Sequence, residues 1–190
     1  EATTGGSAAL FYKKEHRIDI APRENLWLSS HGDLGSFSME MRLSPLVVRE
    51  GAVLFSRIGY LSGAKNGLEI KVQHGRVSAC FYGMFKDNEG NRVNKTVSAR
   101  TPLAAKRWQH YVLSYDRVTG KLSQIIDGRE ESAVFMTETG EPSEGAQGPT
   151  FAGSDMPKTV IAKDYSGYLD EFRISYRPFD ELKQTSDLAS

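Results

Sequence analysis

The stretch RWQHYVLSYDRVTGKLSQIIDGR, residues 107–129, contains two strand-like runs, a short connection and a tight turn. Side chains of the first run alternate, with Trp108, His110, Val112 and Ser114 on one side and Gln109, Tyr111, Leu113 and Tyr115 on the other. Because both sides carry apolar residues, the run is typical of a strand covered on both faces. We therefore expect it inside a sandwich rather than at the edge of a sheet.

The residues after this run predict a β-meander. Gly120 can supply the positive φ that closes a loop starting at Asp116, and residues 121–126 then return beside the first run. Asp127-Gly128 suits a two-residue type I′ turn, because both central positions of that turn need positive φ. Residues 130–135 are expected to form a third antiparallel strand.

Three parts of the chain carry short sequence motifs. They are Phe37-Ser38-Met39-Glu40-Met41-Arg42 near the start, the central Trp108-Gln109-His110, Tyr115-Asp116, Gly120-Lys121-Leu122 and Ile126-Asp127-Gly128, and the C-terminal Gly167-Tyr168-Leu169-Asp170-Glu171-Phe172-Arg173-Ile174. In content and order this set resembles laminin G-like domains of the concanavalin A-like lectin and glucanase superfamily. The resemblance implies an all-β fold, a two-sheet antiparallel β-sandwich (concanavalin A-like jelly roll) of roughly twelve to fourteen strands.

Other runs also read as strands. Residues 36–43 place Phe37, Met39, Met41 and Leu43 on one face and polar residues on the other, so one face is expected in the core. The remaining candidate strands are 9–12, 16–20, 25–29, 52–58, 67–72, 76–81, 158–163 and 168–177. Between strands we expect loops at 31–35, at the glycine-rich 59–66, at the polar 85–94 and at the long 137–157.

The length of 190 residues fits one β-sandwich domain. The small polar residues 1–8 indicate a linker or frayed N-terminus, residues 9–178 the laminin G-like jelly-roll domain, and residues 179–190 a C-terminal tail. Such a linker hints that the chain is a piece of a longer protein.

Charge and cysteine content exclude several classes. Basic and acidic residues balance at 24 each, so nothing favours nucleic acid as a partner. No apolar run reaches the ~20 residues that span a bilayer, so no membrane insertion is expected. Cys80 is the single cysteine and cannot form an intrachain disulfide. The resemblance implies an extracytoplasmic location: periplasmic, cell surface or secreted.

The resemblance makes catalysis one possible activity, because the superfamily includes glucanases. Retaining glycosidases need two carboxyl groups about 5 Å apart, which on one strand requires acids at alternate positions. Asp170 and Glu171 are adjacent and point to opposite faces, and the four histidines lack metal-ligand spacing. We expect no enzyme activity and assign no catalytic residues.

Asp170 raises the question of calcium. Counting by twos along residues 168–177 places it on one face with Tyr168, Phe172 and Ile174, where a carboxylate must be hydrogen-bonded or paired. It could tie down backbone amides of a neighbouring loop, whereas the resemblance implies a calcium ligand at a loop edge. Calcium stays open as a cofactor, and no metal site is assigned because partner ligands cannot be identified.

Aromatic residues in or beside loops are the candidates for ligand contact, since a ring can stack on the apolar face of a sugar. They are Trp27, Tyr60, Tyr82, Phe85 and Tyr165, each also compatible with simple packing. The resemblance implies a non-catalytic recognition module that binds a glycan or a protein. The alternatives are a structural subunit that forms oligomers or joins a larger assembly and, third, a glycan-active enzyme.

Overall fold

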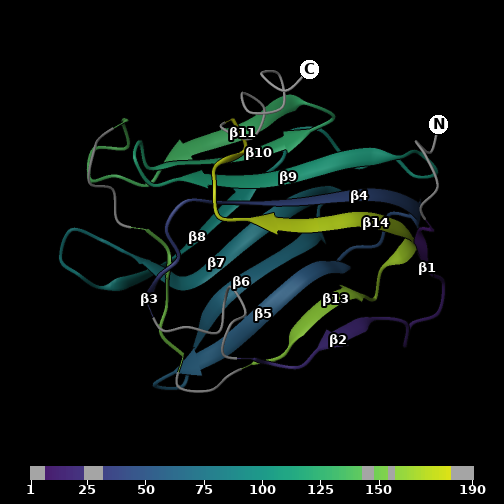
Figure 1. Ribbon diagram of the computed structural model, residues 1–190, viewed down its shortest axis with the longest axis horizontal. Helices are drawn as coiled ribbons and strands as arrows, with labels where there is room; N and C mark the ends of the chain where they lie inside the picture. Colours follow the sequence, from purple (N-terminus) through teal and green to yellow (C-terminus); the bar gives the residue numbers. More distant parts are fainter. Residues whose placement is uncertain (1–6, 24–31, 143–147, 154–156, 181–190) are drawn as a thin grey trace.

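The computed structural model describes residues 7–23, 32–142, 148–153 and 157–180. Within these ranges two six-stranded antiparallel sheets pack face to face, with one additional strand pair (Figure 1). Sheet A contains, in spatial order, β1 (Ala9–Phe11), β14 (Ser166–Ser175), β4 (Phe37–Val47), β9 (Gln109–Asp116), β10 (Lys121–Ile126) and β11 (Arg129–Phe135). Sheet B contains β2 (Ile18–Ile20), β13 (Thr159–Lys163), β5 (Val53–Leu61), β6 (Ala64–Gln73), β7 (Arg76–Lys86) and β8 (Arg92–Ser98). The short strands β3 (Gly32–Asp33) and β12 (Thr150–Phe151) pair with each other, and the predicted all-β sandwich is confirmed.

The predicted meander is present as β9, β10 and β11. Strand β9 lies between β4 and β10, so it is interior to its sheet as expected. Asp127 and Gly128 have φ values of 51° and 77°, the two positive values that a type I′ turn requires. The β10–β11 register shifts at Gln124/Ile125, which marks a β-bulge that the sequence did not reveal.

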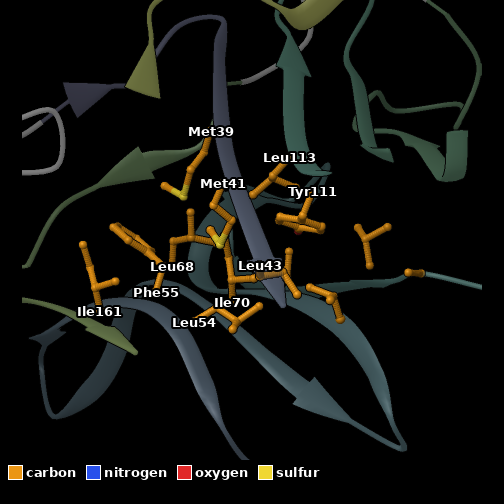
Figure 2. Close-up of a cluster of buried hydrophobic side chains, with 14 of the residues drawn as sticks. Met39, Met41, Leu43, Leu54, Phe55, Leu68, Ile70, Tyr111, Leu113 and Ile161 are labelled. Carbon is orange, nitrogen blue, oxygen red and sulfur yellow. The ribbon is translucent and has the colours of Figure 1, made fainter. Parts of the chain in front are cut away.

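The core lies between the two sheets. Met39, Met41 and Leu43 project from β4 toward Leu68 and Ile70 of sheet B, and all five side chains are fully buried (Figure 2). Burying each such side chain stabilises the fold by about 1.5–3 kcal/mol. The apolar residues that alternate with polar ones through residues 36–43 thus form the inner face of β4.

Loop predictions were less accurate. Strand β5 continues to Leu61 and β6 begins at Ala64, so the expected loop at 59–66 is a tight hairpin whose turn residues, Ser62 and Gly63, both have positive φ. The predicted loops at 31–35, 85–94 and 137–157 likewise contain strand residues of β3, β7, β8 and β12. The strand expected at 25–29 lies outside the described residues.

A bulge in β14 overturns the expected face of Asp170. Its pairing with β4 shifts between Asp170 and Arg173, and Glu171 has a φ of 49°. Because one extra residue reverses the side-chain alternation, Tyr168 and Phe172 point to opposite faces: Tyr168 outward, Phe172 onto the core. Asp170 is half-buried on the outer side, and its Oδ1 accepts a hydrogen bond from the backbone N–H of Glu171 at 2.8 Å.

The C-terminal segment covers part of the outer face of sheet A, the face turned away from sheet B. Phe179 is buried against Val112 and Ile125, and its backbone N–H donates to Ser114 Oγ at 2.9 Å. The outer side of β9 is therefore covered at Val112 and Ser114, as the sequence predicted, whereas Trp108, just before the strand on the same side, is exposed. Among the described residues, no helix has the length and apolar character that a membrane crossing requires.

Candidate functional site

Exposed aromatic side chains gather at one end of the outer face of sheet A. Strand register places Leu10, Tyr168 and Ser44 in one row across β1, β14 and β4. Trp108 immediately precedes β9, and its ring centroid lies 6.1 Å from that of Tyr168, with the ring planes inclined by 43°. The two residues are 39% and 37% exposed, although each is supported by the sheet beneath. We call Leu10, Trp108 and Tyr168 the aromatic platform.

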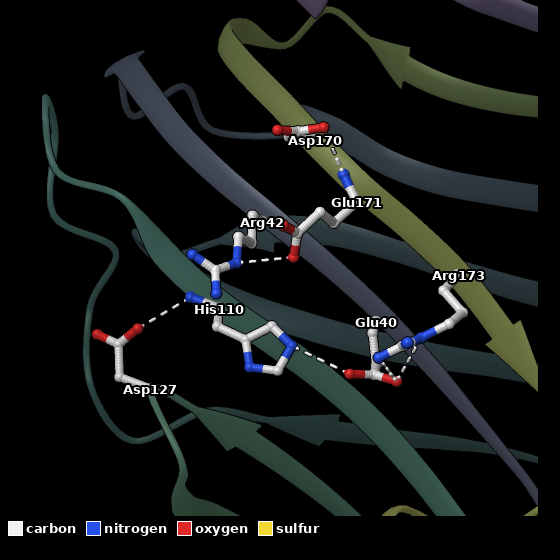
Figure 3. Close-up of polar contacts among 7 residues, drawn as sticks. All are labelled: Glu40, Arg42, His110, Asp127, Asp170, Glu171 and Arg173. Atoms are coloured by element: carbon white, nitrogen blue, oxygen red, sulfur yellow. Dashed lines mark hydrogen bonds and ion pairs between the residues drawn. The ribbon is translucent and has the colours of Figure 1, made fainter. Parts of the chain in front are cut away.

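A set of charged residues lies one side-chain step farther along the same strands. The register aligns Asp170, Arg42 and His110 across β14, β4 and β9, two residues along β4 from the platform row. Two residues of a strand span about 7 Å, so the rows are neighbours on the outer face. Figure 3 shows these side chains together with Glu40, Glu171 and Arg173. We call Glu40, Arg42, His110, Glu171 and Arg173 the polar cluster.

Glu40 is the centre of the polar cluster. Only 4% of its side chain is exposed, and Arg173 donates to Oε1 from Nε at 3.0 Å and approaches the same oxygen with Nη2 at 2.9 Å. His110 Nε2 lies 3.2 Å from Oε2. The hydrogen bonds with Glu40 raise the pKa of Arg173 above its ordinary value. A carboxylate held at both oxygens is fixed in position, and it fixes the more exposed arginine and histidine in turn.

Two further arginines of this region, Arg42 and Arg107, are also paired with carboxylates. Arg42 Nε lies 2.9 Å from Glu171 Oε2 in a solvent-exposed ion pair. Asp127 accepts the backbone N–H of His110 at 2.8 Å, and its other carboxylate oxygen lies 3.0 Å from Nη2 of Arg107. The outer face therefore presents polar groups of both signs in a defined arrangement beside two exposed rings.

Two of the aromatic residues selected from the sequence, Tyr60 and Tyr82, share the outer face of sheet B. Tyr60 pairs with Lys65 across β5 and β6, and the Lys65 ammonium lies 5.1 Å from the centroid of the Tyr82 ring. Tyr60 is 51% exposed, but the Tyr82 hydroxyl is engaged by Lys71 at 3.2 Å and by Glu69 at 3.3 Å.

The ionisation behaviour of these groups reflects their mutual contacts. Burial raises the pKa of Tyr82 above its ordinary value, while the nearby Lys71 acts in the opposite direction. Burial lowers the pKa of Lys71, but its hydrogen bonds with Glu69 and Tyr82 outweigh that effect and leave it raised. Tyr82 is therefore a neutral, largely satisfied side chain.

The other sequence candidates lie elsewhere. Phe85 is buried, and its ring packs against those of Phe81 and Tyr115. Tyr165 is also buried: its hydroxyl donates to the Tyr168 backbone carbonyl at 3.0 Å, and burial raises its pKa. Both rings belong to the core rather than to a solvent-facing surface, and Trp27 lies outside the described residues.

Trp108 and Tyr168 are the aromatic residues that sequence reasoning did not select. The sequence pattern correctly predicts Trp108 on the same strand side as His110, but it predicts cover along that whole side, whereas Phe179 covers only the part around Val112 and Ser114. Tyr168 was placed on the same side as Phe172, because the bulge at Glu171 leaves no clear signal in the sequence. The pairing of β4 with both β14 and β9 brings the two rings together.

The described residues do not fit a calcium site. Across these residues, no group of three or more histidine, cysteine or acidic side chains converges as metal ligands would. Asp170 bonds to its own neighbour, Glu171 pairs with Arg42, and the Asp87 carboxylate accepts backbone N–H groups of Glu89 and Asn91 in its own turn. Hydrogen bonds from Asn91 lower the pKa of Asp87 below its ordinary value.

The fold is a two-sheet antiparallel β-sandwich, and sequence comparison assigns its family. The laminin G-type model described as the concanavalin A-like lectin/glucanases superfamily matches residues 24–182. The chain belongs to this family, and the resemblance noted in the sequence is confirmed. No curated protein matches the chain significantly.

Two solved structures with a similar fold are much longer than this chain. One is a protein from Bacteroides ovatus ATCC 8483 named for a suspected carbohydrate-binding role, with a TM-score of 0.60, 15% identity, and coverage of 90% of this chain and 43% of that one. Another is domains LG4-5 of the mouse laminin α1 chain, with a TM-score of 0.52, 13% identity, and coverage of 84% and 40%. The chain thus spans less than half of either structure, and identities this low indicate shared fold alone.

Proposed function

We propose that this chain is a non-catalytic recognition module that binds a glycan on the outer face of sheet A. The observation that carries the proposal is the contact between the exposed rings of Trp108 and Tyr168 directly beside the polar cluster. Family membership and the name of the Bacteroides ovatus relative support glycans as the ligand class.

The chemistry of this face suits a saccharide. A sugar offers C–H groups on its ring face and hydroxyl groups around its edge, so it needs an aromatic surface next to fixed donors and acceptors. The rings supply the first, and Arg42, His110 and Glu171 supply the second. Because Glu40 holds His110 and Arg173 in place, little side-chain entropy would be lost on binding.

The same contacts argue against catalysis on this face. A glycosidase needs one carboxyl group that can donate a proton and a second that attacks or activates water. Glu40 and Glu171 are each held by an arginine, an arrangement that fixes a carboxylate rather than leaving it to transfer protons. The polar cluster is therefore better suited to hold a ligand than to cleave it.

Family membership supports a proposal for the protein context. We place the module outside the cytoplasm, in a periplasmic, cell-surface or secreted protein, with the jelly roll at 9–178 between a linker at 1–8 and a tail at 179–190. Relatives that extend well beyond the matched region are consistent with a module inside a longer protein. Glycan remains preferred over a protein ligand because the platform lies beside hydrogen-bonding groups rather than within a wide apolar patch.

A glycan-array screen of the purified chain tests the proposal, run with calcium and again with chelator. We expect saturable binding that Trp108→Ala and Tyr168→Ala weaken at least about tenfold, equivalent to ~1.4 kcal/mol, while Tyr60→Ala leaves it unchanged. Because the described residues do not fit a calcium site, chelation should have no effect.

Tyr60→Ala is the matched control, since it removes an exposed ring from the opposite sheet. If Tyr60→Ala or Tyr82→Ala abolishes binding instead, the site lies on sheet B. Absence of binding to every glycan would contradict the proposal and turn attention to protein partners or oligomeric assembly.

A further inference from the structure

We infer that the ligand of the outer face of sheet A is an uncharged oligosaccharide, rather than a sulfated or uronic-acid glycan. This inference rests on the proposed function and specifies its ligand class. It comes from the charge pairing around the aromatic platform and from the length of the surface.

Each arginine next to the platform is already neutralised by a carboxylate. Arg42 pairs with Glu171 at 2.9 Å, Arg173 with Glu40 at 2.9 Å and Arg107 with Asp127 at 3.0 Å. A sulfate or carboxylate on a sugar that bonded the unused N–H groups of one of these arginines would lie next to the carboxylate already paired with it, and the two negative charges would repel each other. Recognition of anions normally depends on arginines whose fork is available to the ligand.

The charge arrangement favours hydroxyl groups instead. A hydroxyl both donates and accepts, so it can bond a guanidinium and a carboxylate of the same ion pair without separating them. Asp170, half-buried at the end of the same row as Arg42 and His110, adds a further acceptor. Such a surface binds hydroxyl groups and discriminates against negative charge.

The size of the surface indicates more than one sugar unit. The platform row crosses β4 at Ser44, and the polar cluster extends along that strand to Glu40. Four residues of a strand cover about 13 Å, at roughly 3.3 Å per residue. The platform and the farthest cluster residue are thus separated by more than a single sugar ring can bridge.

The opposite sheet provides an internal contrast. On sheet B, Lys65 is exposed and, within the described ranges, forms a contact with the Tyr82 ring but no ion pair with a carboxylate. An anionic glycan would be attracted to that surface rather than to the platform. The two ligand classes are therefore expected to respond to mutations on opposite sheets.

The test is isothermal titration of the chain with matched oligosaccharides. The neutral set contains gluco-, xylo- and manno-oligosaccharides, and the anionic set contains oligogalacturonates and heparin-derived fragments. We expect the wild-type chain to bind a neutral member, with affinity unchanged between low and high ionic strength and reduced at least about tenfold by Trp108→Ala.

Glu171→Gln provides a gain-of-function variant. It leaves Arg42 without its carboxylate, so it should create salt-sensitive binding of an anionic oligosaccharide on the platform face, which Trp108→Ala then removes. Asp19→Asn, which removes the carboxylate shared by Arg17 and Lys158 on sheet B, is the control and should not confer binding that depends on Trp108.

The outcomes separate the inference from the proposed function. If wild-type chain binds anionic glycans on the platform face, with loss in Trp108→Ala, the inference is wrong and the proposed function stands. If no oligosaccharide of either set binds, both are wrong. Thermal midpoints of all variants close to that of the wild-type chain would show that the differences do not come from unfolding.

Discussion

The outer faces of the two sheets carry similar residue types in different arrangements. On sheet A, two aromatic rings contact each other and their charged neighbours pair among themselves. On sheet B, Tyr82 is surrounded by Lys65, Lys71 and Glu69, which contact its ring or bond its hydroxyl. A ring covered by lysines has little surface left for a ligand. A candidate binding site is therefore recognised by whether other side chains cover its aromatic rings, and not by the number of aromatic residues.

The largest effect is expected from two glycines with equivalent roles in the two sheets. Gly67 of sheet B and Gly167 of sheet A have φ values of 151° and 155°, and a Cβ at either would collide with a neighbouring backbone carbonyl, of Arg57 and Ser44 respectively. Gly67→Ala and Gly167→Ala should each lower the free energy of unfolding by about 2–4 kcal/mol. Urea denaturation measures both.

Gly90→Ala is the control for backbone strain alone. Its φ is 84°, but a Cβ there meets no atom within 4 Å, so the cost should stay near ~1 kcal/mol. Because Gly167 precedes Tyr168, Gly167→Ala should also weaken glycan binding, whereas Gly67→Ala should not. Unfolding midpoints for Gly67→Ala and Gly167→Ala equal to that of Gly90→Ala would contradict this account.

A smaller difference in stability is expected between variants of the central carboxylates of the two outer faces, Glu40 on sheet A and Glu69 on sheet B. Glu40 is buried and bonds two partners, whereas Glu69 is more exposed and contacts Lys71 and Tyr82. Glu40→Gln should cost about 1–3 kcal/mol of stability, because both of its oxygens have partners. Glu69→Gln should cost less than about 1 kcal/mol, because Lys71 and Tyr82 contact the same oxygen, Oε2, and an amide oxygen can accept from both. Chemical denaturation of both variants checks the order, and a larger loss for Glu69→Gln would reverse the comparison.

The smallest effect is expected in the pH dependence of stability and comes from a contact at a sheet edge. At the edge of sheet A, the backbone N–H of Thr101 donates to the buried carboxylate of Glu131 at 2.8 Å. At the edge of sheet B, the paired strands β7 and β8 share an additional hydrogen bond between the hydroxyl groups of Ser78 and Ser98 at 2.8 Å. Burial raises the pKa of Glu131, but the hydrogen bonds from Thr101 outweigh it and the net pKa lies below its ordinary value. A lowered folded-state pKa stabilises above the unfolded-state pKa, and that contribution disappears as pH falls through the folded-state value.

The stability of the wild-type chain should therefore decline as pH falls below the ordinary carboxyl value of about 4.5. In Glu131→Gln that decline should be shallower, while Ser98→Ala should leave its slope unchanged because no titrating group is removed. Thermal melting across this pH range measures the slopes. Parallel curves for Glu131→Gln and wild type would show that Glu131 contributes nothing to the acid limb.

The sequence predicted the scaffold better than the site, for reasons visible in particular residues. The alternation in β9 and the Asp127-Gly128 turn are local signals, and both predictions are confirmed. The contact between Trp108 and Tyr168 joins residues far apart in the chain and depends on strand register. Phe85 lies beside polar turn residues in sequence, yet the register shift in β7 between Phe81 and Phe85 accompanies its burial. Long-range register and bulges are the information that periodicity alone lacks.

The bulge at Glu171 also bears on how such a surface could arise. In a regular strand, Tyr168 and Phe172 would lie on the same face, so Tyr168 would point into the core together with Phe172. One inserted residue places these two side chains on opposite faces. Phe172, in the later half of β14, packs against the core, while Tyr168, in the earlier half, exposes its ring to solvent. A single-codon insertion can therefore turn Tyr168 outward and Leu169 inward while Phe172 keeps its place against the core.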